Sequence, residues 1–241
     1  MIADTEAQSH VVGVVLLLGL TVVALGGLTA VVGTVVDGHT ATADEARVAN
    51  TFDASLRPVE QTGHRTVRVR VSEGRLTTVD RELRVLDDAG TQRTVPIDAM
   101  VYESDSSRVG YLGGAVVRGP PGNARLERRP RVTATRDDTA VIVGAPVLNA
   151  SDVAVSGSGG VTATLRLNVS HERETLPATN YSVALETATP RPIEAAFQRV
   201  GATTRVTDLD GDGVDSVVAT FPGERTLYLI RHDMRTEVRH G

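Results

Sequence analysis

The hydrophobic positions divide the chain into stretches with different periods. Between Val11 and Val36 the sequence has 26 residues without a charged side chain. As a helix this stretch would be roughly 39 Å long, which exceeds the ~30 Å hydrocarbon core of a bilayer and allows a tilted crossing. We therefore predict an N-terminal transmembrane α-helix within residues 8–36 that anchors the chain once in the plasma membrane, with the C-terminal part extracellular.

A helical face continues beyond this segment. Val48, Phe52, Leu56 and Val59 recur at the spacing of one face of a helix, and Gly63 follows them as a stop signal. The pattern predicts a helical stalk over residues 37–62.

From His64 the period changes to two. In "HRTVRVRVS" the valines alternate with arginines, and "GVTATLRLNVS" repeats the alternation. Further strands are predicted at residues 82–86, 94–102, 109–118, 131–135, 139–143, 180–187, 203–207, 214–221 and 225–231. Many short strands separated by Gly, Pro, Asp and Asn predict a mainly β, antiparallel sandwich-like domain over residues 63–241.

Two segments interrupt this β pattern. "PRPIEAAFQRVG" predicts one short late helix, because Ile193, Ala196 and Phe197 share a helical face and Gly201 follows as a stop. "SGSGG", from Ser156 to Gly160, is either a loop between strands or a linker between two β halves.

Composition narrows the function classes. The 25 basic residues are all arginine, cysteine is absent, and the net charge is −5. The chain therefore has no disulfide, thiolate nucleophile or thiolate metal site. A mildly acidic chain is also a poor binder of polyphosphate, which argues against nucleic acid as a partner.

The N-terminal residues carry a resemblance to a known family. Glu6-Ala7-Gln8-Ser9, followed by His10-Val11-Val12-Gly13, resembles the start of haloarchaeal type IV pilins and archaellins, and the lysine-free composition is similar to that of halophilic archaeal proteins. The resemblance covers about residues 5–36. It implies that a prepilin peptidase removes a leader of residues 1–7 by cutting between Ala7 and Gln8, and that the partners are membrane lipid and other pilin-like subunits.

Small residues within the apolar segment suit close helix packing. Gly26, Ala30, Thr34 and Gly38 recur every fourth residue and form one stripe along a helix. Glycine and alanine are also simply common in transmembrane helices. Three functions stay open: a minor subunit of a pilus-like filament or its assembly base, an uncleaved anchor that displays a binding or structural module, and a secreted hydrolase or binding protein released after Ala43.

Three Asn-x-Ser sequons lie in the β region, at Asn149, Asn168 and Asn180. The alternation places Asn168 and Asn180 on polar strand faces, where a glycan has room. Chance occurrence is the competing explanation, since serine is abundant in the chain.

"DLDGDGVDS" is the sharpest local motif. Asp208, Asp210 and Asp212, followed by Gly213, match the first half of a calcium loop, in which alternate carboxylates converge on a hard cation. The Val214 carbonyl and Ser216 would be further ligands, and bound Ca²⁺ would rigidify the hairpin. The alternative is a solvated Asp-Gly turn between two strands.

No motif indicates an enzyme. The histidines have no metal-ligand spacing, and His171 with Glu172 and Glu174 is predicted to lie in a solvated loop. "RLERRPR", from Arg125 to Arg131, is predicted to be a solvated rim paired with Glu127 and Asp137, or a contact for a glycan or lipid headgroup.

Overall fold

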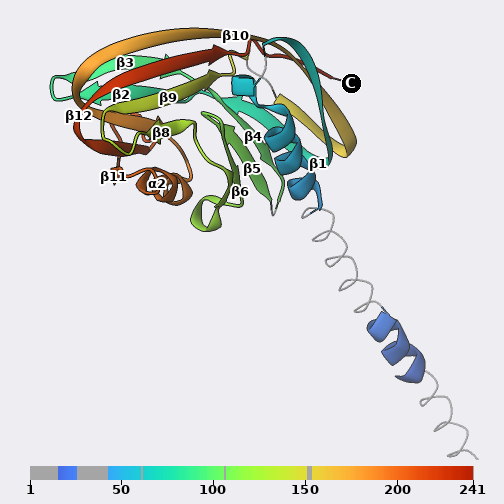
Figure 1. Cartoon of the computed structure of the whole chain (residues 1–241). Coiled ribbons are helices and arrows are strands. Elements are labelled where there is room, and N and C mark those ends of the chain that lie inside the picture. Colours follow the sequence, from blue (N-terminus) through green and yellow to red (C-terminus); the bar gives the residue numbers. More distant parts are fainter. Residues whose placement is uncertain (1–15, 26–42, 61, 106, 151–153, 241) are drawn as a thin grey trace, which may run out of the picture. The chain divides into compact units, whose positions relative to one another are not determined.

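The structure is a computed structural model that describes residues 16–25, 43–60, 62–105, 107–150 and 154–240 (Figure 1). The chain divides into two compact units, Met1–Thr42 and Ala43–Gly241. In the first unit the described residues 16–25 are helical. The second unit contains a helix over residues 43–55 and all the described strands.

The predicted transmembrane helix over residues 8–36 is wrong on this structure. None of the helices formed by the described residues has both the length and the apolar character that crossing a bilayer requires. The described helix of residues 16–25 would extend only about 15 Å, half of a ~30 Å hydrocarbon core. The predicted single-pass plasma-membrane localisation is corrected with it.

Several N-terminal predictions lie outside the described residues. These are the leader of residues 1–7, its cleavage between Ala7 and Gln8, and the stripe of Gly26, Ala30, Thr34 and Gly38.

The second unit is mainly β. After the 3-10 helix η1 (Pro58–Glu60) come β1 (Gly63–Val79), β2 (Glu82–Asp87), β3 (Gly90–Pro96), β4 (Ala99–Glu103), β5 (Arg108–Leu112), β6 (Ala115–Arg118), η2 (Pro121–Asn123), β7 (Arg125–Arg128), β8 (Val132–Ala134), β9 (Ala140–Val147), β10 (Ala154–Glu186), α2 (Pro190–Gln198), β11 (Thr203–Thr207), β12 (Ser216–Asp233) and β13 (Glu237–His240). The described strands join in the order β7-β6-β5-β4-β1-β10-β12-β9-β8. In addition, β2 and β13 pair with β10, β3 with β2, and β11 with β12.

β10 connects the two halves of this sheet. Its first half runs antiparallel to β1, with Val67 opposite Leu165, and its second half runs antiparallel to β12, with Ala184 opposite Val218. In Figure 1 the orange strand therefore passes along the whole β domain. One continuous strand replaces the separate sheets that the sequence predicted.

Two hydrophobic cores lie against this sheet. The helix of residues 43–55 buries Val48 and Phe52, together with Leu56 just after it, against the half that contains β1, β4, β5 and the start of β10. The second core lies among β2, β9, β12, α2 and the opposite face of β4 to β6. In β4, Met100 and Tyr102 face the first core, whereas Ala99 and Val101 face the second.

Local backbone geometry explains where the strand predictions differ from the structure. The predicted strand 109–118 is a hairpin, because Gly113 and Gly114 adopt φ of 52° and 84° between β5 and β6. The predicted strand 94–102 is divided at Asp98, which has φ of 49°. "SGSGG" is neither loop nor linker but part of β10, paired with β1 across a bulge after Val71.

The late helix is confirmed as α2, which buries Ile193, Ala196 and Phe197. Pairing between strands is not purely antiparallel, however. β9 and β12 are parallel, with Leu227 opposite Val141. The wholly antiparallel arrangement predicted from the sequence is therefore corrected.

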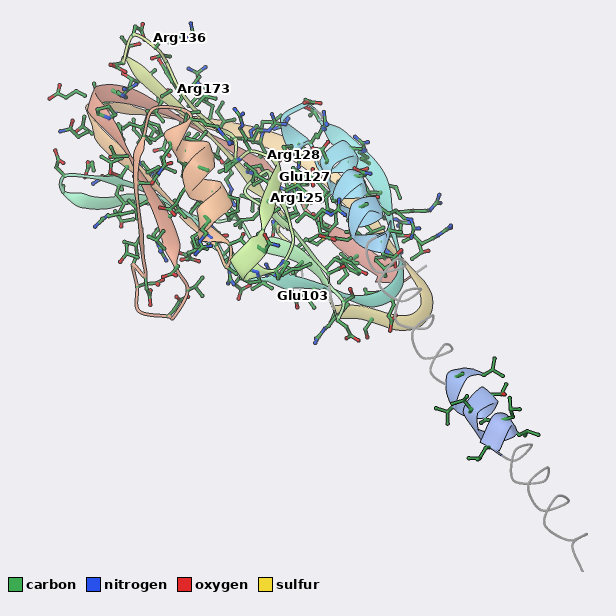
Figure 2. All side chains as sticks on the ribbon, turned by 90° about the horizontal axis from the view of Figure 1, so that it is seen from below. Glu103, Arg125, Glu127, Arg128, Arg136 and Arg173 are labelled. Carbon is green, nitrogen blue, oxygen red and sulfur yellow. The ribbon has the colours of Figure 1, made fainter. Side chains whose placement is uncertain are left out.

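Arg128 ties the helix of residues 43–55 to the sheet (Figure 2). Its guanidinium donates to the Asp53 carbonyl at 2.7 Å, to the Leu56 carbonyl at 2.9 Å and to the Gly114 carbonyl at 2.7 Å. Carbonyls in the last turn of a helix have no partner within the helix, so one fork-shaped cation satisfies two of them and a hairpin together. The burial of Arg128 lowers the pKa of its guanidinium.

Replacing Arg128 with methionine should destabilise the second unit by about 3 kcal/mol, because three buried carbonyls lose their charged donor. The matched control is Arg125→Met in the same strand, where the side chain is 65% exposed and a change within about 0.5 kcal/mol is expected. Urea unfolding followed by circular dichroism measures both. Equal midpoints for the two variants would contradict the role assigned to Arg128.

Candidate functional site

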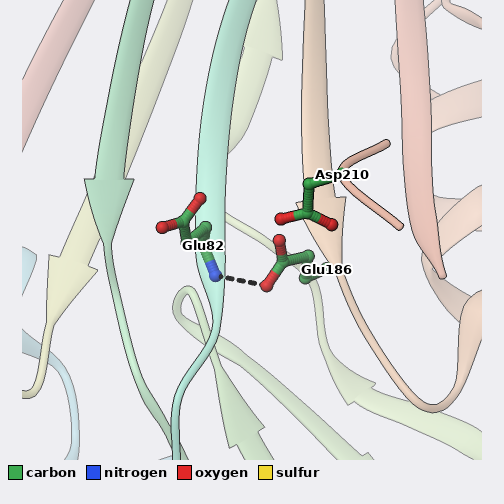
Figure 3. A group of neighbouring side chains, drawn as sticks. All are labelled: Glu82, Glu186 and Asp210. Atoms are coloured by element: carbon green, nitrogen blue, oxygen red, sulfur yellow. Dashed lines mark hydrogen bonds between the residues drawn. The ribbon is translucent and has the colours of Figure 1, made fainter. Parts of the chain in front are cut away.

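Three carboxylates converge on one guanidinium at the edge of the second core. Nη2 of Arg84 lies 2.6 Å from Glu82 Oε2, 2.7 Å from Glu186 Oε1 and 2.5 Å from Asp210 Oδ2. Figure 3 shows the three acidic side chains, with the Glu82 backbone N–H donating to Glu186 Oε2 at 2.9 Å. We call these four residues the Arg84 cluster.

The strand register explains how the Arg84 cluster forms. Leu83 pairs with Leu185, so Glu82 at the start of β2 and Glu186 at the end of β10 lie next to each other. Arg84 pairs with Ala184, two residues before Glu186, and therefore shares its face of the sheet. Asp210 comes from the loop between β11 and β12, and its bond to Arg84 holds that loop against the same face.

The electrostatics of the cluster are unbalanced. Arg84 and Glu186 have side chains only 9% and 5% exposed, so both charges are largely removed from water. Burial raises the pKa of Glu186, opposed by the Glu82 backbone amide and by Arg84. The pKa of Arg84 is also raised, because Glu186, Glu82 and Asp210 outweigh the desolvation of the guanidinium. Three carboxylates around one cation leave an excess of negative charge when all are ionised.

The predicted calcium residues form an adjoining group. Asp208, Asp210 and Asp212 each place a carboxylate oxygen within 4.8 Å of the others. Asp208 accepts from the amides of Gly211 at 2.8 Å and Gly213 at 3.0 Å, and these bonds lower its pKa.

The remaining predicted ligands are used differently. The Val214 amide donates to Asp212 Oδ1 at 2.8 Å. Ser216 begins β12, is 1% exposed and lies opposite Glu186, with its hydroxyl unpartnered among the described residues. Because Arg84 already occupies the centre of its carboxylates, a Ca²⁺ ion that used Asp210 would compete with a guanidinium. Calcium binding by this loop stays a prediction.

A pair of histidines connects β10 and β12 near the middle of the molecule. His171 and His232 pair in register, and their Nδ1 atoms are 2.8 Å apart. His171 Nε2 lies 3.0 Å from the hydroxyl of Thr62, which precedes β1. Burial, reinforced by His171 and Arg131, lowers the pKa of His232 to about 4.

The predicted solvated loop at His171 is therefore a strand. Its signal was present in the sequence, because His171 continues the inward alternation of Leu165, Leu167 and Val169. Glu174, on the same strand, instead pairs with Arg93 at the surface.

The other predicted surface residues are distributed as follows. Arg125 pairs with Glu127 at 3.1 Å, whereas Asp137 accepts from the Thr139 hydroxyl at 2.8 Å. The three sequon asparagines lie at accessible positions: the side-chain amide of Asn149 donates to Asp233 at 3.4 Å, that of Asn180 donates to Asp88 at 3.0 Å, and Asn168 lies opposite His64 on the outer face of the sheet. Glycosylation stays a prediction.

Sequence comparison assigns a family to the chain. It belongs to DUF7289, a family of unknown function, whose model matches residues 6–237. No curated protein and no solved structure matches the chain significantly.

Replacing Arg84 with methionine should destabilise the second unit by about 3 kcal/mol at pH 7, because the buried Glu186 carboxylate loses its cation. Added Ca²⁺ should recover part of that loss in the variant, since the carboxylates become free to bind a metal, and should shift the wild type less. Arg93→Met, at a surface ion pair 44% exposed, is the control and should change stability by less than about 1 kcal/mol. Thermal melting with Ca²⁺ and with chelator measures all three. An equal Ca²⁺ shift in wild type and variant would assign the ion to the loop alone.

Acid should destabilise the fold through His232. Its pKa is lowered from 6.5 to about 4, so the native state holds it neutral and the unfolded state protonates first. The contribution is complete above pH ~6.5 and is lost as the pH falls toward 4, by at most about 3 kcal/mol. His232→Gln should flatten this part of the urea-midpoint profile, whereas His64→Gln, at an exposed position, should keep it. A profile with the wild-type slope in His232→Gln would contradict the assignment.

Proposed function

We propose that the chain is a pilin-like subunit that associates with other copies through its apolar N-terminal segment, in a type IV pilus-like filament or its assembly base, and displays the β unit. The observation that carries the proposal is the exposed helix of residues 16–25. Its seven large apolar side chains are between 58% and 73% exposed: Leu16, Leu17, Leu18, Leu20, Val22, Val23 and Leu25.

The exposure of this helix is exceptional among the described residues. Outside it, the only large apolar side chains as exposed as 38% or 39% are Val206 and Ile142. The second unit closes its own cores without using the helix, since both contain only residues from Val48 onward. A contiguous apolar surface of this kind indicates an interaction site.

Burial energetics favour an apolar partner. Full burial of a leucine or valine side chain stabilises by about 1.5–3 kcal/mol, so covering seven side chains that are roughly two-thirds exposed is worth roughly 10 kcal/mol. That is enough to offset a substantial part of the cost of association. A second copy supplies a matching surface because it carries the same uncharged segment, from Val11 to Val36. The resemblance of Glu6 to Gly13 to pilin N-termini supports this choice of partner.

Two acidic substitutions in the helix, Leu17→Asp and Leu20→Asp together, should weaken self-association of the full chain at least a hundredfold, because charge cannot be buried in an apolar contact. The control carries Thr175→Asp and Thr203→Asp, two exposed positions on strands of the second unit, and should associate like the wild type. Sedimentation velocity across a concentration series measures association. Mass spectrometry should find the same N-terminus in every sample, at Gln8 if the leader is removed. Unchanged association of the helix variant would refute the proposal.

A further inference from the structure

One face of the sheet presents a group of arginines to solvent. Arg68 and Arg70 alternate with the buried valines of β1 and therefore point outward. Arg68 pairs with Thr164 of β10, and Thr164 pairs on its other side with Arg239 of β13, so the three residues form a row across the sheet. Arg166 lies one pleat further along β10, on the same face. We call Arg68, Arg70, Arg166 and Arg239 the arginine face.

The arginine face has little internal compensation. Within the part of the chain that the structure describes, Arg68, Arg70 and Arg166 take part in no ion pair, and Arg239 is paired only with Glu237 at 3.4 Å. By contrast, Arg84, Arg128 and Arg225 each contact acids or carbonyls of their own chain. Neighbouring strands are about 4.8 Å apart and outward residues on one strand about 7 Å apart, so the four guanidiniums concentrate positive charge in one small area.

The opposite charge gathers at the β11–β12 loop. Residues 208–215 contain four aspartates and no basic residue, and all four aspartates are exposed. Arg84 neutralises only Asp210 among them. We call residues 208–215 the acidic loop.

The two charged surfaces are too far apart to meet within one chain. Twenty residues of β10 separate Arg166 from Glu186, which lies beside the start of β12 at Ser216. At about 3.3 Å per residue this is roughly 65 Å along the strand. Figure 1 likewise shows β11 and β1 at opposite ends of the β domain. A contact between them requires two molecules, and such a head-to-tail contact repeats from copy to copy.

We propose that the arginine face of one copy binds the acidic loop of the next copy, which fixes the order of subunits in the assembly. This inference rests on the proposed function, since it adds the contact between β units to the apolar association. Charge complementarity selects a second copy as the occupant. Single-stranded nucleic acid is disfavoured, because no Phe, Tyr or Trp for base stacking lies among the described outward positions around the arginine face.

Charge exchange in the full chain tests the contact. The face variant carries Arg68→Glu and Arg166→Glu, and the loop variant carries Asp212→Arg and Asp215→Arg, which leaves Asp210 on Arg84 and Asp208 on its glycine amides. Each variant alone should associate at least tenfold more weakly than the wild type at 50 mM salt. An equimolar mixture should recover wild-type association, because each variant then faces a partner of opposite charge. Light scattering at 50 and 500 mM salt measures assembly, circular dichroism confirms folding, and Arg68→Gln with Arg166→Gln provides a neutral second variant.

The outcomes separate this contact from the proposed function. Wild-type association of the face variant, or a mixture that recovers nothing, overturns the contact. If the charge variants assemble normally while Leu17→Asp with Leu20→Asp does not, the apolar assembly stands without this contact. If only the charge variants fail, the contact stands and the apolar assembly falls. A face variant that loses binding to dextran sulfate but assembles normally would identify a free polyanion as the occupant and overturn the contact. A wild type that stays monomeric at both salt concentrations overturns both proposals.

Discussion

The continuity of β10 is the constraint on which the second unit depends. One strand of 33 residues supplies hydrogen bonds to β1 and β13 at its beginning and to β12 and β2 at its end. Its inward side chains enter both cores, Leu165 in the first and Val183 in the second. A register slip of one residue would turn every side chain to the wrong face, so both cores hold the strand in place together. The His171–His232 pair lies where β10 passes from one set of partners to the other.

Arginine closes the edges that the strands leave open. Arg128 satisfies carbonyls at the end of the helix of residues 43–55, Arg84 holds the acidic loop, and Arg225 donates to the Pro222 carbonyl at 2.9 Å and contacts Asp138. In each case a planar fork with several donors reaches groups from different segments, which the single ammonium of lysine cannot do with the same geometry. A chain whose basic residues are all arginine therefore fastens its loops and helix with side chains that the sequence alone indicated as a solvated rim.

Local patterns predicted local structure well. Alternation located β2, β9 and β11, and helical spacing located α2 and the face of Val48, Phe52 and Leu56. What the sequence did not predict depends on contacts between distant segments. Arg84 lies 126 positions from Asp210, and His171 lies 61 from His232, so no spacing rule connects either pair. The uncharged N-terminal run was misassigned for a different reason, since hydropathy measures the apolar character of a segment and does not determine the extent of the helix that it forms.

The second unit satisfies itself, and that fact gives meaning to what it leaves exposed. Its apolar residues close two cores, its acidic loop is partly neutralised by Arg84, and its helix end is capped by Arg128. A fold that pairs its charges so consistently elsewhere has no stability reason to keep several arginines unpaired on one outer face. The helix of residues 16–25 likewise exposes apolar surface that nothing within its own unit covers among the described residues. Two uncompensated surfaces of different chemistry on one chain, one apolar and one cationic, are expected where binding needs both affinity and orientation: apolar contact supplies the free energy, and placed charges select the geometry.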